Sequence, residues 1–410
     1  HDAPMFGPNG DESIIKCGTF PGADSTVDLG WEPQFVLIKA TSATSPWTVL
    51  DSMRGWTGYN VNGNQPLRAN EYTTEINNDA SLGGLTSTGF YTNNVGSHDY
   101  IYMAIRRPHK PASKYAPTDL FTVAAGSSSS TPAYVSDFPV DMEFIRAPSV
   151  SGGSTETGSR LLGKNIMRLN SNIAAGAEAK TKFDYTNGWR DQDTFASSYF
   201  SWMFRRAPGF FDVVTYEGDG VAGREVPHSL GATPEMMWAK RTSTSENWYV
   251  YSKTTGATQT MVLNFPNASA NSSETWGGEP TDALFAVGHG GATNENGSAY
   301  ITYLFASVPG ICDIGSYTGT GAALNIDCGF TNGARFILIK RTDSTGDWYY
   351  WDTLRGIVAG NDPYLLLNST AAQVTNTDYV DPLSSGFTVT AAAPAALNNN
   401  GGTYIYMAIA

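Results

Sequence analysis

The chain has 410 residues and a formal net charge of −13, and only 15% of its residues are charged, against roughly 25% in an average soluble domain. Aromatic residues reach 12% and glycine 43 copies, a composition typical of all-β proteins with many turns. The negative charge and the lack of long Lys and Arg runs argue against binding to nucleic acid phosphates. No stretch of 18 or more apolar residues is present, so we also expect no membrane insertion.

One short phrase recurs four times along the chain. The clearest copies are Tyr100–Ile105 and Tyr404–Ile409, with a weaker copy at Tyr300–Phe305 and the weakest at Tyr199–Phe204. Their first tyrosines are 99, 101 and 104 residues apart, whereas solenoid repeats span roughly 20 to 50 residues. Each repeat is therefore the size of a domain.

The sequence upstream of this phrase also repeats. The first and last copies share an apolar stretch ending in lysine, then a tryptophan, then an aspartate and an arginine three residues apart. These are, in order, Phe35–Lys39, Trp47, Asp51 and Arg54, and Phe336–Lys340, Trp348, Asp352 and Arg355. The third copy keeps Trp248 but lacks the aspartate and arginine, and the second, with Met142–Arg146, lacks the tryptophan as well. All four copies keep an asparagine after a short apolar stretch: Asn70, Asn170, Asn264 and Asn368.

The pattern of the closing phrase predicts a central β-strand. Strand side chains alternate between two faces, and both faces of Tyr100–Ile105 are apolar, as expected for a strand covered on both sides. Short strands and glycine-rich turns within about 100 residues predict two packed antiparallel sheets in each repeat. We therefore expect an all-β protein of four tandem β-sandwich repeats, of jelly-roll or lectin-like type. The alanine-rich Asn165–Phe183 region is where we expect a helix.

The ends of the repeats predict the domain boundaries. Pro108–Lys114 reads as a stiff connector, because proline fixes φ, and the later joins are shorter. The chain starts at His1 without methionine and stops at Ala410 within a strand phrase, which favours a piece of a longer protein. The predicted segments are an N-terminal arm (1–16), repeat 1 (17–110), the diverged repeat 2 (111–209), repeat 3 (210–307) and repeat 4 (308–410).

Three cysteines in four repeats cannot form a recurring disulfide framework. Cys328 aligns with Leu29 and Leu230, so it reads as a core position. We expect Cys17, Cys312 and Cys328 to be buried free thiols. A bridge between Cys312 and Cys328 is the alternative.

The sequence offers no catalytic constellation. The five histidines share no equivalent position between copies and no metal-ligand spacing; they are His1, His98, His109, His228 and His289. Asp191 and Asp193 could offer oxygens to a hard cation, but calcium takes six to eight ligands and no further acidic cluster is close in sequence. We expect no metal, no cofactor and no enzymatic activity.

Two recurring features remain as site candidates. Asp51 with Arg54, and Asp352 with Arg355, could lock a turn through a charge-assisted hydrogen bond or clamp a ligand. The third copy lacks both partners, which favours the structural role, and a partly exposed pair would contribute about 1 kcal/mol. The recurring tryptophans Trp47, Trp248 and Trp348 could stack on sugar rings, but recurrence at one strand position favours core residues.

Taken together, these phrases resemble tandem modules of uncharacterised function in virion proteins of tailed bacteriophages, especially marine ones. The matching residues are Gly315–Gly319, Ile337–Thr342, Trp348, Asp352–Gly356, Leu365–Asn368 and Gly401–Ile409. The resemblance covers three copies well and the second in outline. It implies a virion structural protein, in a tail fibre or as capsid decoration, and no known active site.

Three functions follow from this resemblance, in order of preference. The first is a structural protein in the virion that contacts other virion proteins and forms a homo-oligomer. The second is a receptor-binding module for a host surface glycan. The third is a polysaccharide depolymerase, which would need two carboxylates some 5 to 10 Å apart across a groove, and no such pair recurs in the sequence.

Overall fold

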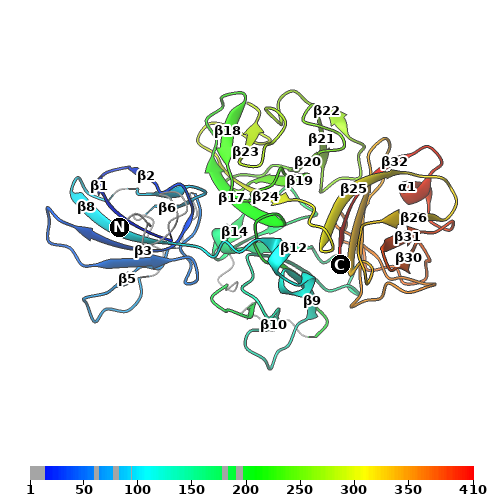
Figure 1. The fold of residues 1–410 in the computed structure, drawn as a ribbon, viewed down its shortest axis with the longest axis horizontal. Coiled ribbons are helices and arrows are strands. Elements are labelled where there is room, and N and C mark those ends of the chain that lie inside the picture. Colours follow the sequence, from blue (N-terminus) through cyan, green and yellow to red (C-terminus); the bar gives the residue numbers. More distant parts are fainter. Residues whose placement is uncertain (1–13, 60–63, 77–82, 94, 178–182, 191–196) are drawn as a thin grey trace, which may run out of the picture.

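The computed structural model of the protein describes residues 14–59, 64–76, 83–93, 95–177, 183–190 and 197–410, and the predicted all-β class is confirmed. Antiparallel sheets occur in pairs along the chain, one large and one small (Figure 1). We call the stretches that contain these pairs unit 1 (15–106), unit 2 (121–204), unit 3 (211–305) and unit 4 (312–409).

Unit 1 has a large sheet of order β1-β8-β3-β4-β5 and a small sheet of order β2-β7-β6. Its first strand begins at Ile15, so the boundary predicted after residue 16 is too late. The strands are β1 Ile15–Pro21, β2 Thr26–Asp28, β3 Pro33–Ala40, β4 Thr48–Asp51, β5 Leu67–Arg68, β6 Gly84–Thr86, β7 Gly89–Tyr91 and β8 Asp99–Arg106.

Unit 2 has the sheets β14-β13-β12-β11-β16-β9 and β10-β15. The short 3-10 helices η1 (Ala112–Lys114) and η2 (Pro117–Asp119) precede it, and η3 (Arg160–Leu162) lies within it. The strands are β9 Phe121–Ala125, β10 Tyr134–Val135, β11 Met142–Arg146, β12 Glu156–Ser159, β13 Asn165–Arg168, β14 Gly176–Ala177, β15 Gly188–Trp189 and β16 Phe200–Phe204.

Unit 3 has the sheets β17-β24-β19-β20-β21-β22 and β18-β23, and unit 4 has β25-β32-β27-β28-β29 and β26-β31-β30. Unit 3 consists of β17 Phe211–Glu217, β18 Arg224–Pro227, β19 Met236–Arg241, β20 Trp248–Ser252, β21 Gln259–Val262, β22 Ala270–Asn271, β23 Leu284–Val287 and β24 Ala299–Phe305. Unit 4 consists of β25 Cys312–Thr318, β26 Leu324–Asp327, β27 Phe336–Arg341, β28 Trp348–Asp352, β29 Leu365–Leu366, β30 Val380–Leu383, β31 Gly386–Val389, α1 Ala395–Asn398 and β32 Thr403–Ile409.

The four large sheets share one connectivity. In each, the closing strand (β8, β16, β24 or β32) lies between the first and the third strand of its unit. The second strand pairs with the strand before the closing one, in the small sheet. The four units therefore share one strand connectivity.

The helix expected over Asn165–Phe183 is wrong for the described part of that region. Residues Asn165–Arg168 form β13, which pairs with β12 on one side and β14 on the other. Helix propensity is a weak preference even for alanine, and the buried apolar residues Met167 and Leu169 gain more from the sheet and its core.

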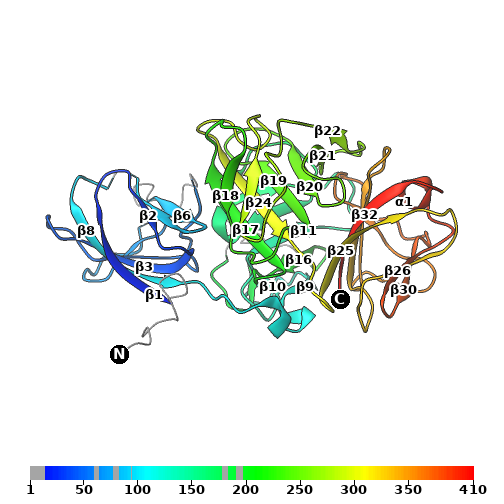
Figure 2. The same ribbon diagram turned by 45° about the horizontal axis from the view of Figure 1, so that its top comes forward.

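Units 2, 3 and 4 surround a common core, and unit 1 lies to one side of them (Figures 1 and 2). One face of each large sheet in these three units packs on its own small sheet, and the other face points into the shared core. Aromatic rings of different units contact each other there. The ring centres of Phe121 and Phe336 are 5.3 Å apart, and those of Phe204 and Phe305 are 6.0 Å apart. Such contacts add to the large apolar area that the aromatic side chains bury.

Candidate functional site

Units 2, 3 and 4 are joined by equivalent backbone hydrogen bonds that close a ring. In each unit the residues that follow the recurring asparagine lie against the neighbouring unit. We call these residues the docking segment. The amide of Glu246 donates to the carbonyl of Asn172, and the amide of Ala175 donates to Thr242. The same two bonds join unit 3 to unit 4, from Gly346 to Pro266 and from Ser269 to Thr342. They join unit 4 back to unit 2, from Gly152 to Thr370 and from Gln373 to Pro148.

The recurring asparagine holds this docking segment in place within its own unit. The side-chain oxygen of Asn264 accepts the amide of Trp248 at 2.9 Å, and that of Asn368 accepts the amide of Trp348 at 2.9 Å. In unit 2 Asn170 accepts the amide of Thr155 at 2.9 Å. Because each bond satisfies an amide that the sheet leaves without a strand partner, it fixes where the docking segment starts.

Two of the three recurring tryptophans lie between units. Trp248 and Trp348 are fully buried, and their indole nitrogens donate to carbonyls of the preceding unit: Trp248 to Arg168 at 2.9 Å and Trp348 to Val262 at 3.1 Å. Trp47 is 36% exposed. The prediction of a core residue is therefore wrong for Trp47, because it assumed that sequence position alone decides burial.

A lysine at the end of the third strand contributes to the same contacts. Lys240 and Lys340 are fully buried, and their ammonium groups donate to Asn172 and Pro266 of the neighbouring unit at 3.4 and 3.2 Å. Burial lowers the pKa of both lysines to about 8. This role was not predicted from the sequence, although a lysine near the end of an apolar strand recurs in three copies.

Unit 2 reaches the same result with different residues. Thr155 stands where the other units have tryptophan, and Arg146 stands where they have lysine. Arg146 is fully buried and donates to Thr155 at 3.0 Å and to the backbone carbonyls of Ser369 and Ala371 in unit 4. Arg146 therefore contacts the neighbouring unit at the place where the other units use lysine, so this contact of the three-unit ring is kept.

The two aspartate–arginine pairs form, but in different surroundings. In unit 4 Asp352 and Arg355 lie 2.6 Å apart with side chains 0% and 2% exposed, and Trp202 of unit 2 donates to Asp352 at 3.1 Å. Asp51 and Arg54 lie 2.7 Å apart and are 17% and 26% exposed. The expectation of a partly exposed pair is therefore wrong for unit 4, because the pair lies in the contact between units 4 and 2.

A buried ionic cluster joins unit 1 to the ring. Arg206 donates to both oxygens of Glu32 at 2.7 Å and to Asp212 at 2.8 Å, and Arg107 contacts Asp212 at 3.1 Å. Burial by itself would raise the pKa of Asp212, but the guanidinium groups of Arg206 and Arg107 outweigh it and hold that pKa at about 2.

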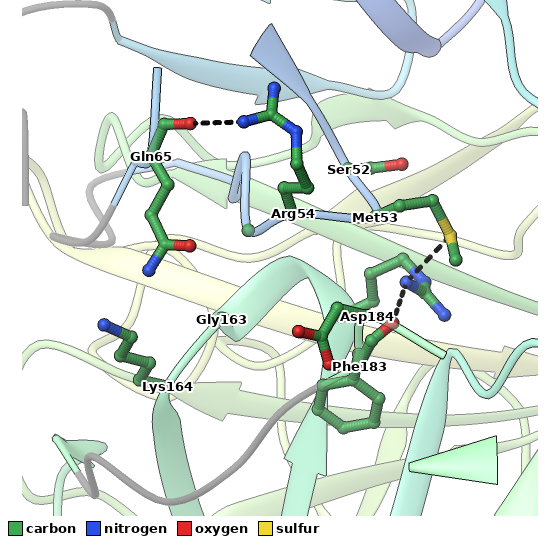
Figure 3. Close-up of a pocket in the computed structure, with 10 residues that line it drawn as sticks. Ser52, Met53, Arg54, Gln65, Gly163, Lys164, Phe183 and Asp184 are labelled. Carbon is green, nitrogen blue, oxygen red and sulfur yellow. Dashed lines mark hydrogen bonds between the residues drawn. The ribbon is translucent and has the colours of Figure 1, made fainter. Parts of the chain in front are cut away.

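A small cavity of about 50 Å³ lies where units 1 and 2 meet (Figure 3). Its wall includes Arg54, Lys164, Arg160 and Asp184. Arg160 is held by the carbonyl of Phe183 at 2.5 Å and by the sulfur of Met53 at 3.2 Å, both drawn in Figure 3. This volume suits one or two water molecules and is too small for a sugar ring.

A larger pocket of about 320 Å³ opens at one end of unit 1. Tyr100, His98 and Arg68 line it, together with Phe20. In unit 4 the corresponding tyrosine, Tyr404, is fully buried and donates to the carbonyl of Ala395 at the start of α1. Unit 1 therefore has an opening at a place where α1 covers unit 4.

The three cysteines are free, with Cys312 and Cys328 buried and Cys17 exposed. The absence of a bridge agrees with the prediction for these described residues, but burial is wrong for Cys17. We expect three thiols to react with a thiol reagent after unfolding without reductant, while Cys312 and Cys328 stay unreactive in the native protein. Burial raises the pKa of both and keeps them as thiols. Fewer than three reactive groups in denaturant would contradict this.

Asp362 gives unit 4 a pH-dependent stability. Its buried carboxylate accepts the amide of Val358 at 2.7 Å, and burial, then the nearby Asp378 and Asp381, raises its pKa from 3.8 to about 7. Its contribution to stability is thus fully present below about pH 3.8 and is lost as the pH rises through 7. Asp362→Asn keeps the acceptor, so between pH 4 and 8 the variant should gain on the order of 1 to 4 kcal/mol relative to the native protein.

Denaturant unfolding at both pH values measures this difference. Asp327→Asn, which changes an exposed carboxylate of the same unit, is the control and should leave the pH profile unchanged. An Asp362→Asn profile parallel to that of the native protein would show that the carboxylate does not titrate in this range.

The remaining candidates show no chemical constellation in the described part of the chain. His228 is buried as a neutral ring that accepts the amide of Leu230, and it lies 3.2 Å from the carbonyl of Thr281. Asp191 and Asp193 lie outside the described residues. Across the residues that the structure describes, no group of three or more His, Cys, Asp or Glu side chains is arranged to hold a metal ion. No helix in the same residues is long and apolar enough to span a membrane.

The fold and its contacts define an all-β protein whose described residues form paired antiparallel sheets joined by recurring docking segments. The family described as "Domain of unknown function (DUF7483)" matches residues 15–108 and 184–410, well over half of the chain, and the protein belongs to this family. The comparison with curated proteins gave no match, and neither did the comparison with solved structures.

Proposed function

We propose that the protein is a structural component of a bacteriophage virion, in a tail fibre or on the capsid surface, that works through protein–protein contacts and catalyses no reaction. The observation that carries the assembly role is the repeated contact between units, in which the same edge of each unit docks on the next. A fold that joins its own copies in one chain already has the surfaces needed to join other chains. The virion itself rests on the sequence resemblance to phage modules.

The surroundings of the charged groups support a role without catalysis. Three of the buried carboxylates, those of Asp352, Asp212 and Glu32, each contact an arginine. An acid or base catalyst needs a carboxylate that can meet a substrate, and these three are taken up in contacts between units.

Immunoelectron microscopy of purified phage particles, with an antibody against this protein, tests the proposal. We expect gold label on the tail or on the capsid, and its position distinguishes a fibre from a decorating protein. Particles without label that still contain their other structural proteins would contradict the virion role. Release of reducing sugars from host envelope polysaccharide by the purified protein would contradict the absence of catalysis.

Binding of a host glycan is the second candidate, favoured by the pocket of about 320 Å³ in unit 1. It combines an aromatic ring, Tyr100, with the polar groups of His98 and Arg68, which suits recognition of a small polar ligand. Tyr100→Ala should then abolish adsorption to host cells while label on the particles persists. Unchanged adsorption would contradict glycan binding at this pocket and would favour the structural role.

A further inference from the structure

The surface that each ring unit uses to meet its neighbours is uncovered in unit 1. In unit 3 the inward face of the large sheet includes Trp238, Trp248, Val250, Ile301 and Tyr303, each no more than 1% exposed. Register aligns these five with Leu37, Trp47, Val49, Ile101 and Met103 of unit 1. None of the five is buried there, and Trp47 and Ile101 are each 36% exposed. We call these five residues and Cys17 the open face.

Unit 1 also keeps the docking groups at the edges of this face. Asn70 accepts the amide of Trp47 at 2.7 Å, as the equivalent asparagines do in the ring. Lys39 stands where Lys240 and Lys340 reach the neighbouring unit, but it donates to Ser45 of its own unit. The counterpart of the acceptor residue Pro266 is Tyr72, whose side chain is fully exposed. Donor and acceptor edges are therefore both present in unit 1, and no other unit among the described residues contacts them.

We propose that the open face binds the open faces of two other copies of this chain, so that three units 1 form a ring like that of units 2, 3 and 4. The contact has a donor edge and an acceptor edge on opposite sides of each unit, and such a head-to-tail contact closes only if its rotation allows. Within the chain it closes after three units. The same fold with the same edges should also close after three.

The equivalent contacts follow from this register. Trp47 of one copy donates to the carbonyl of Arg68 in the next, as Trp248 does to Arg168. Lys39 donates to the carbonyl of Tyr72, as Lys340 does to Pro266. The amide of Glu75 donates to the carbonyl of Thr41, as that of Ala175 does to Thr242.

The position of unit 1 leaves this face accessible to other chains. Unit 1 meets the ring where β6 contacts β17, through Gly58, whose amide donates to Leu161, and through Glu32, which accepts from Arg206. None of these residues belongs to the open face. The open face belongs to the large sheet, on the side opposite to the small sheet. An apolar face of this kind commonly marks a protein–protein contact.

Light scattering coupled to size exclusion tests the trimer on the full-length protein. We expect the mass of three chains of 44.0 kDa for the native protein. Ile101→Asp and Trp47→Asp should each lower the mass threefold to that of one chain, because a carboxylate on this face cannot be buried without a partner. Both side chains are partly exposed in the single chain, so circular dichroism and the melting temperature should change little.

Leu354→Asp is the matched control, because Leu354 is an apolar side chain that is 47% exposed on unit 4 and lies outside the open face. It should stay trimeric. A native mass of one or two chains at all concentrations, or equal dissociation by the control, would overturn the proposal. The proposal rests on the proposed assembly role, but the two can fail separately: a single chain that still labels the virion would refute only the trimer, and a trimer absent from virions would refute only the location.

Discussion

Replacing Arg206 by methionine is expected to destabilise the protein by about 3 to 5 kcal/mol, because it leaves Glu32 and Asp212 buried without their main partner. All three side chains are at most 4% exposed, so water cannot replace the lost hydrogen bonds. Thermal unfolding of the full-length protein measures the loss. Because the cluster joins unit 1 to the ring, unit 1 should separate from the ring first, which limited proteolysis at the 107–120 connector would detect.

The pH dependence gives this prediction a second readout. In the native protein the pKa of Asp212, about 2, lies below its ordinary value of 3.8, so its contribution to stability is present above pH 3.8 and lost as the pH falls through 2. Without Arg206 only Arg107 and the amide of Ser229 oppose the effect of burial, so that pKa rises. The variant should therefore lose less stability at pH 5 than at pH 7.

Two further variants serve as controls for the ionic cluster. Lys253→Met removes an ion pair with Glu235 whose lysine is 66% exposed, so it should cost no more than about 1 kcal/mol. Glu32→Gln in the Arg206→Met background should restore part of the stability, because it removes one uncompensated charge. Equal effects of Arg206→Met and Lys253→Met would show that the cluster does not hold the units together.

Arg355→Ala and Arg54→Ala form a matched pair with a large expected difference. The two arginines hold the same position in units 4 and 1 and contact aspartates at nearly the same distance, 2.6 and 2.7 Å. Arg355→Ala leaves the buried Asp352 without its partner and should cost about 3 to 5 kcal/mol. Arg54→Ala acts on a pair partly exposed to solvent and should cost no more than about 1 kcal/mol.

Chemical denaturation of the two variants under identical conditions measures this difference. Arg355 also stacks on Tyr350 at 5.1 Å and lies 5.6 Å from the Trp202 ring of unit 2, so its loss should also loosen the contact between units 4 and 2. Similar costs for the two variants would mean that burial does not govern the pair. Loss of host adsorption by Arg54→Ala at unchanged stability would instead indicate that the unit 1 pair faces a ligand.

Much of the fold follows from local sequence. The apolar residues of Tyr100–Ile105 and Tyr404–Ile409 identify strands, and both phrases form strands flanked by two others. The expectation of two covered faces is wrong for Tyr100–Ile105, because Ile101 on one face is 36% exposed. The glycine-rich turns separate these strands, because glycine alone adopts positive φ without strain, as at Gly220 and Gly321. The all-β class could therefore be predicted from the sequence.

Only part of the candidate site could be predicted from the sequence. Recurrence identified Trp47, Trp248 and Trp348 as equivalent residues, and Asp51 and Asp352 as another equivalent pair. It also predicted the same surroundings for equivalent residues in every copy. The structure separates them, since Trp348 donates to a carbonyl of unit 3 while Trp47 is exposed. The exchange of tryptophan and lysine for Thr155 and Arg146 had no visible meaning until both were seen at one contact.

The sequence by itself determined the strands, their apolar faces and the recurrence of the docking elements, because each depends on residues within one repeat. The tertiary structure alone decided which copies meet, that units 2, 3 and 4 close into a ring, and that unit 1 keeps its open face. The physical reason is that burial belongs to a surface and its neighbour together. Ile101 and Ile301 occupy the same strand position, yet they are 36% and 0% exposed, because only one of them has other units packed against it.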